Sequence, residues 1–161
     1  MNFKAISYYL SLFCFPVSFL SFVNILYSSY FDYFLNIESY TFTLIISLSI
    51  SSLLYLAGKN SIKKLNFLEQ ISLILAVYIV SSILISVPYY LSIYQITFIN
   101  ALFESFSGIT STGFTIFENI KYLDPTLILW RSSSQWIGGL YFFIFLVLIF
   151  SNKQFNYKLC Y

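Results

Sequence analysis

Long runs of hydrophobic residues dominate this chain and are separated by short polar segments. Four runs cover residues 8–27, 40–57, 71–90 and 126–150, and only the last contains a charged residue, Arg131. A helix of about 20 apolar residues crosses the roughly 30 Å hydrocarbon core of a bilayer. The pattern therefore predicts four transmembrane helices.

The first run could also be a signal peptide, because Lys4 precedes it. It is longer than the roughly 7–15 apolar residues of a signal peptide, however, and no A-x-A-like cleavage site follows. An uncleaved helix is therefore the favoured interpretation. Within it, we expect Pro16 to mark a kink and Asn24 to hydrogen-bond to a neighbouring helix.

The composition excludes a soluble fold, since 59% of the residues are hydrophobic and only 9% are charged. Soluble domains carry roughly 25% charged residues. The chain has no histidine, and Cys14 and Cys160 are isolated, so neither a metal site nor a disulfide is expected. We expect no enzyme, because no nucleophile and base form a pair, and no nucleic-acid partner, because the net charge is only +2.

Basic residues predict the orientation, because they collect on the cytoplasmic side of a membrane protein. With four spans and both termini cytoplasmic, six of the eight basic residues lie inside: Lys4, Lys59, Lys63, Lys64, Lys153 and Lys158. Lys121 then lies outside, and Arg131 lies near the outer end of the fourth span. Gly58 is expected to end the second helix as a glycine cap.

The segment between the third and fourth spans has helical character but is too short to cross. Residues 97–109 would extend about 18 Å as a helix, and they include Glu104. Thr97 can cap the start, and Leu102, Phe103 and Phe106 form an apolar stripe. The segment is therefore predicted to be re-entrant or interfacial, which makes the expected fold an all-α membrane protein with four transmembrane helices and one short pore helix.

The next residues, 110–115, are neither apolar nor helix-like. Irregular backbone at membrane depth occurs only where protein buries it or where it lines a water-filled path. Gly113 allows the dihedral angles that turn successive carbonyls to one axis, as in a cation filter. The short helix would also direct its negative end to a cation. An ordinary extracellular turn is an equally good interpretation of the spacing alone.

Two blocks of sequence carry a resemblance to a known family. Residues 100–114, NALFESFSGITSTGF, match the pattern A-x-F-E-S-x-S-G-x-T-T-T-G of the first pore loop of the TrkH/KtrB (Trk/Ktr/HKT) family of potassium transporters. Residues 127–140, LILWRSSSQWIGGL, resemble the family's L-x-W-R-S-x-x-Q-W-x-G-G-x-G. Ser111 replaces a threonine of the first pattern, and Tyr141 replaces the last glycine of the second.

The resemblance implies four helix–pore loop–helix units around one potassium pathway. Residues 65–151 would be the first unit, and residues 1–64 would be the N-terminal helix pair that favours the TrkH branch. Residues 152–161 would be a short cytoplasmic tail. Since only one unit is present, the sequence is expected to be an N-terminal fragment.

Carried over to this chain, the resemblance assigns one quarter of a potassium filter. The implied filter residues are Thr110, Ser111, Thr112 and Gly113. The implied supporting residues are Phe114, Thr115, Glu104 and Arg131. A glycine at Gly113 is the potassium-selective variant. For Glu104 we favour an ion pair with Arg131 over a free charge at the pore mouth.

The same resemblance implies a location in the bacterial cytoplasmic (inner) membrane and a cytosolic TrkA-like nucleotide-binding regulatory subunit. Potassium is the cargo, and no cofactor is expected. Two alternatives stay open: a homotetramer in which four identical loops form one filter, and a non-transporting remnant or membrane scaffold. In the fourth span, Gly138 and Gly139 are expected to allow close packing against the pore helix rather than to form a gating hinge.

Overall fold

The computed structural model describes residues 2–60, 65–92, 94 and 96–151. Its elements are α1 (Phe3–Tyr30), α2 (Ile37–Gly58), α3 (Phe67–Leu91), α4 (Phe98–Ile109), the 3-10 helix η1 (Ile120–Tyr122) and α5 (Pro125–Ser151). Four of them, α1, α2, α3 and α5, are long and apolar enough to cross a membrane. The predicted all-α fold with four spans and one short helix is confirmed for the described residues.

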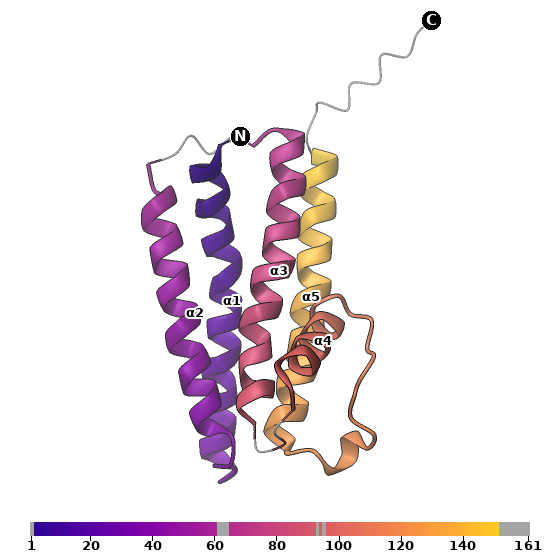
Figure 1. The fold of residues 1–161 in the computed structure, drawn as a ribbon. Helices are drawn as coiled ribbons and strands as arrows, with labels where there is room; N and C mark the ends of the chain where they lie inside the picture. Colours follow the sequence, from indigo (N-terminus) through magenta and orange to yellow (C-terminus); the bar gives the residue numbers. More distant parts are fainter. Residues whose placement is uncertain (1, 61–64, 93, 95, 152–161) are drawn as a thin grey trace, which may run out of the picture.

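The four long helices lie side by side and alternate in direction (Figure 1). Helix α1 therefore begins and α5 ends at the same end of the bundle. Helix α3 ends at the opposite end of the bundle, where α4 begins. Helix α4 reaches only part of the way along the bundle and lies beside α5. The chain then returns through η1 to the end of the bundle where α4 began. This course places the loop after α4 beside the bundle, part of the way along its length.

The helices begin earlier than the hydrophobic runs because polar residues cap them. Asn2 accepts the N–H of Ala5 on its side chain (3.2 Å), so α1 begins at Phe3. At the start of α3, the Glu69 carboxylate accepts the N–H of Asn66 (2.9 Å) and completes a capping box. These bonds satisfy N–H groups that the helix itself leaves unpaired.

The expected end of the second helix at Gly58 is confirmed, although Gly58 does not have the positive φ of a left-handed glycine cap. Gly58 is the last residue of α2, and the capping residue Lys59 has right-handed helical angles (φ −51°, ψ −40°). A Cβ on Gly58 would lie 2.5 Å from the backbone nitrogen of Tyr8 and 2.6 Å from the carbonyl oxygen of Lys4. The glycine is therefore used for close approach of α1 and α2.

The expected helix–helix hydrogen bond of Asn24 does not form among the described residues. Its side-chain amide donates to the carbonyl of Leu20 in its own helix (3.0 Å), and its Oδ1 is buried without a partner among the described residues. A short polar side chain inside a helix can reach the carbonyl four residues back, and here that local bond wins.

Two aromatic residues of α5 bind backbone carbonyls beside the prolines of α1 and α3. Trp130 donates its indole N–H to the carbonyl three residues before Pro88 (3.1 Å). Tyr141 donates its hydroxyl to the carbonyl three residues before Pro16. A proline removes the helical hydrogen bond to the carbonyl four residues back, and both donors bind the carbonyl next to that one. Both bonds also fix α5 against the other helices.

The buried face of α4 is not the apolar stripe that the sequence suggested. Phe103 and Phe106 are 47% and 38% exposed, whereas small and polar residues of the helix are buried. The buried residues are Ala101, Glu104, Ser105, Ser107, Gly108 and Ile109. Membrane helices pack through small residues because there is no hydrophobic gain in burying large ones away from lipid. Two residues of the apolar stripe, Phe103 and Phe106, therefore lie on the exposed side of α4.

Candidate functional site

Helix α4 ends in a Schellman motif that starts the candidate filter loop. The N–H of Thr112 donates to the carbonyl of Ser107 (3.1 Å), and the N–H of Ser111 donates to the carbonyl of Gly108 (2.9 Å). Ser111 occupies the left-handed position of the motif, with φ 57°. This conformation costs a residue with a side chain about 1–2 kcal/mol. The sequence contained no signal for it, because the residue is not glycine.

The next residues keep the same arrangement. Gly113 also has a positive φ, 80°, and its N–H donates to the carbonyl of Ser107 (3.4 Å). Three successive N–H groups, from Ser111 to Gly113, are thus turned back to the end of α4. The carbonyls of Thr110, Ser111 and Thr112 accept no hydrogen bond from the described residues. Three consecutive carbonyl oxygens are therefore available to a ligand.

The hydroxyl groups of these residues point their hydrogens into the protein. Thr110 donates to the carbonyl of Phe106 (2.6 Å), Ser111 donates to the carbonyl of Gln135 (3.0 Å), and Thr112 donates to a carbonyl of α4 (3.3 Å). All three residues are exposed in this structure. Each hydroxyl oxygen thus keeps lone pairs for a cation, although its hydrogen is engaged.

Glu104 is buried behind the loop and binds the residues that follow the candidate filter. It is fully buried on α4, and its carboxylate accepts the hydroxyl of Thr115 (2.5 Å) and the N–H of Ile116 (2.6 Å). It also forms an ion pair with Arg131 of α5. The favoured pairing of Glu104 with Arg131 is confirmed. A buried carboxylate with these three donors is not a free charge at a pore mouth.

Arg131 connects α5 to the loop backbone. Besides its ion pair with Glu104, its Nη2 donates to the carbonyls of Gly113 (2.9 Å) and Phe114 (3.2 Å). The Phe114 carbonyl also accepts the hydroxyl of Ser107 (2.6 Å). The guanidinium thus holds the end of the candidate filter. It also engages the carbonyl of Gly113, which the sequence interpretation had counted among the filter ligands.

Close packing of α5 against α4 supports the site. A Cβ on Gly138 would lie 2.6 Å from the carbonyl carbon of Ile109, and a Cβ on Gly108 would lie 2.5 Å from the hydroxyl oxygen of Ser134. At Gly139 the nearest atom would be at an ordinary 4.0 Å. The expected close packing is therefore confirmed at Gly138, where only glycine fits.

A buried polar cluster at the start of α5 was not predicted from the sequence. The carboxylate of Asp124 accepts the side-chain amide of Asn36 (2.6 Å) and the hydroxyl of Thr126 (2.6 Å), and Tyr40 donates to the same hydroxyl (3.1 Å). The N–H of Asp124 donates to the hydroxyl of Tyr94 (2.8 Å). The cluster ties α2 to α5. Its one sequence signal is the aspartate before a proline, a typical helix start.

The comparisons with known proteins agree with this architecture. The family model TrkH, described as "Cation transport protein", matches residues 36–158, which is most of the chain. The chain belongs to the TrkH family. No solved structure matches it.

Curated relatives place the chain beside named members of the TrkH family. It is 47% identical over 55 residues to the Trk system potassium uptake protein TrkI of Halomonas elongata, covering 34% of this chain and 11% of that protein. It is 32% identical over 99 residues to the Trk system potassium uptake protein TrkG of Escherichia coli, which covers 61% of this chain and 20% of that protein. It is 34% identical over 76 residues to an uncharacterized cation transporter of Methanocaldococcus jannaschii, which covers 47% of this chain and 16% of that protein.

The matches cover only part of each relative. The chain spans between 11% and 22% of the length of the curated relatives it matches. Together with the four apolar helices, the family shows a multi-pass membrane protein whose relatives are named as transporters and uptake proteins.

Proposed function

We propose that this chain takes part in potassium transport across a membrane and supplies one loop of a potassium filter. The filter ligands are the carbonyls of Thr110, Ser111 and Thr112, assisted by their hydroxyl oxygens. A filter of this kind replaces the hydration shell of the ion with oxygen ligands. The proposal involves no covalent chemistry and no cofactor, because selection and passage are the whole activity.

The observation that carries the proposal is the run of three unpaired carbonyls after α4. Their N–H groups are satisfied by the end of α4, so the loop keeps its shape without using the carbonyls. The C-terminal end of a helix carries a partial negative charge, and α4 ends directly before these ligands. Arg131 compensates the charge of Glu104, so this carboxylate does not present an unpaired negative charge to the ion.

In this proposal Gly113 shapes the loop and is not a main ligand. Its φ of 80° is unfavourable for any side chain, and its carbonyl is bound by Arg131. A residue with a side chain here would both strain the loop and add atoms next to Gln135, whose Nε2 would lie 3.9 Å from a new Cβ. Selectivity for potassium over sodium at this position follows from the family likeness.

The orientation proposed from the sequence places both termini in the cytoplasm of a bacterial cell with the protein in its inner membrane. In support, Lys4 and Lys59 lie at the end of the bundle where α1 begins, whereas Lys121 lies at the other end in η1. The remaining lysines, at positions 63, 64, 153 and 158, lie outside the described residues. The loop after α4 would then open to the outside.

Three further pore loops must complete the filter, and they come either from identical copies or from further repeats. A cytosolic TrkA-like subunit would regulate the assembly, as the family likeness implies. The division into a helix pair, residues 1–64, and a pore unit, residues 65–151, remains part of the proposal.

Growth of a bacterial strain that lacks its own potassium uptake systems tests the proposal. The chain is expressed on limiting potassium, alone in one arm and together with any pore loops encoded directly downstream in the other. We expect growth in at least one arm, and we expect Gly113→Asp to abolish it while Glu118→Gln, an exposed control in the same loop, does not. No growth in either arm, with the protein present in the membrane, would overturn the proposal.

A further inference from the structure

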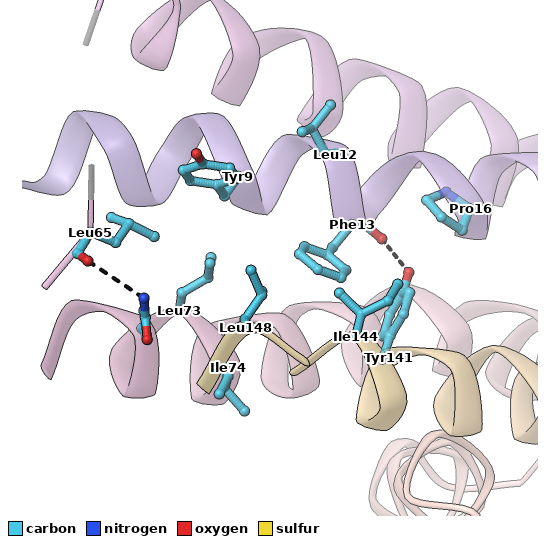
Figure 2. Close-up of a pocket in the computed structure, with 11 residues that line it drawn as sticks. Tyr9, Leu12, Phe13, Pro16, Leu65, Leu73, Ile74, Tyr141, Ile144 and Leu148 are labelled. Atoms are coloured by element: carbon cyan, nitrogen blue, oxygen red, sulfur yellow. Dashed lines mark hydrogen bonds between the residues drawn. The ribbon is translucent and has the colours of Figure 1, made fainter. Parts of the chain in front are cut away.

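An apolar groove lies between α1, α3 and α5, and extends from Tyr141 toward the end of the bundle where α1 begins. Its volume is about 440 Å³, and ten of its eleven lining residues are hydrophobic or aromatic. Figure 2 shows residues that line it: Tyr9, Leu12, Phe13 and Pro16 on α1, Leu73 on α3, and Tyr141, Ile144 and Leu148 on α5. The walls on α1 and α5 each extend over about two helical turns, roughly 10 Å, and the wall on α3 extends over about one turn.

The groove has a closed floor and an open side. Leu73 on the floor is 1% exposed, whereas Leu12 and Ile144 at the rim are 50% and 40% exposed. The groove offers few polar groups to a solvent molecule, because its lining is almost entirely apolar and the hydroxyl of Tyr141 donates to the carbonyl of Phe13. Water does not fill apolar cavities of this kind. An unfilled groove of this size would forfeit many dispersion contacts.

One polar atom lies at the end of the groove. Gln70 is in the first turn of α3, at the end of the bundle that also holds Lys4 and Lys59. Its amide N–H is directed at the carbonyl of Leu65 (3.5 Å), but its Oε1 is buried without a hydrogen-bond partner among the described residues. The groove is thus apolar along its length, with one unused acceptor and positive charge at the membrane-surface end.

We propose that this groove binds one acyl chain of a phospholipid, whose head group donates a hydrogen bond to Gln70. The acyl chain enters the groove from the surrounding bilayer at the rim, beside Leu12 and Ile144, and reaches Leu73. A phospholipid matches both parts of the site, because its apolar chain is continuous with a polar, anionic head that basic residues at the membrane surface attract. This proposal stands independently of potassium transport, since it rests on the groove alone.

Photo-crosslinking tests the proposal with the full chain reconstituted in liposomes. The probe is phosphatidylglycerol that carries a diazirine near the end of one acyl chain, and adducts are mapped by mass spectrometry of peptides. Leu73 is compared with Val77, one turn further along α3, which is fully buried and does not line the groove. Both residues are buried, so lipid that merely surrounds the bundle contacts neither of them. An acyl chain in the groove contacts only Leu73, and we therefore expect at least threefold more adduct at Leu73 than at Val77. Equal labelling would overturn the proposal and would mean that another part of the protein fills the groove.

Two tryptophan variants provide the matched control. Ile144→Trp fills the groove and should lower labelling of Leu73 at least threefold, whereas Val147→Trp, at a 52% exposed position outside the groove, should not. An unchanged unfolding temperature shows that each variant is folded. If both variants lower the labelling of Leu73 equally, the acyl chain does not bind in the groove.

The head-group contact is tested separately by the choice of lipid. Phosphatidylglycerol has hydroxyl donors, whereas the phosphatidylcholine head group has no donor for Gln70. We expect the phosphatidylglycerol probe to label Leu73 more strongly, and Gln70→Leu to remove the difference. Equal labelling by the two probes in the unmodified chain would overturn the role of Gln70.

Discussion

Glu104→Gln removes the charge that compensates Arg131, and its effect follows from burial. Glu104 is fully buried and Arg131 is 7% exposed, so the variant leaves a cation inside the protein without a counter-ion. Breaking a buried ion pair from one side costs about 3–5 kcal/mol. That is a large part of the 5–15 kcal/mol that stabilises a typical protein. At about 2–4 °C per kcal/mol for a chain of this size, the unfolding temperature should fall by about 6–20 °C.

The assay is thermal unfolding of the purified chain in detergent, and a double variant isolates the pair. Glu104→Gln combined with Arg131→Met should recover at least half of the loss, because an apolar residue of similar size can replace a buried ion pair at little cost. Glu118→Gln, an exposed control, should change stability by less than about 0.5 kcal/mol. An unfolding temperature of Glu104→Gln equal to that of the unmodified chain, or a double variant as unstable as the single one, would refute the reasoning.

Three further predictions concern positions around the filter. Gly138→Ala should lower the folded yield because its Cβ collides with the end of α4, whereas Gly139→Ala should not; equal yields would contradict the packing. Gly113→Ala should cost about 1–2 kcal/mol in thermal unfolding because its φ is 80°, and an unchanged stability would show that the loop adopts another conformation. Asn36→Ala should cost about 1.5–3 kcal/mol by removing a donor to the buried Asp124, and a double-mutant cycle with Asp124→Ala should show coupling; additive losses would refute the contact.

Hydropathy predicted the spans well because the membrane leaves few choices. Backbone groups in lipid must be satisfied within their own helix, so a long apolar run becomes a helix with little influence from its neighbours. The ends were less accurate, since α1 begins at the cap of Asn2 rather than at the first residue of the apolar run. The pairing of Glu104 with Arg131 was predictable for a similar reason, because an unpaired charge at that depth is too costly.

The internal face of α4 and the polar cluster of Asp124 could not be predicted in the same way. The large side chains of α4 lie outward because close packing in a membrane selects small residues, which reverses the pattern of a soluble core. Asn36 and Asp124 are 88 residues apart, and each also reads as an ordinary loop or cap residue. The positive φ of Ser111 depends on how α4 ends, which only the three-dimensional structure reveals.

Potassium flux into liposomes is the most direct test that residues 110–113 form a potassium filter loop. The assembly that supports growth is purified, reconstituted and supplied with potassium or sodium outside, with Gly113→Asp as the filter variant and Glu118→Gln as the control. We expect potassium uptake that exceeds sodium uptake, persists in Glu118→Gln and disappears in Gly113→Asp. Flux that is equal for the two ions, or that is insensitive to Gly113→Asp, would contradict the assignment of residues 110–113 as a potassium filter loop.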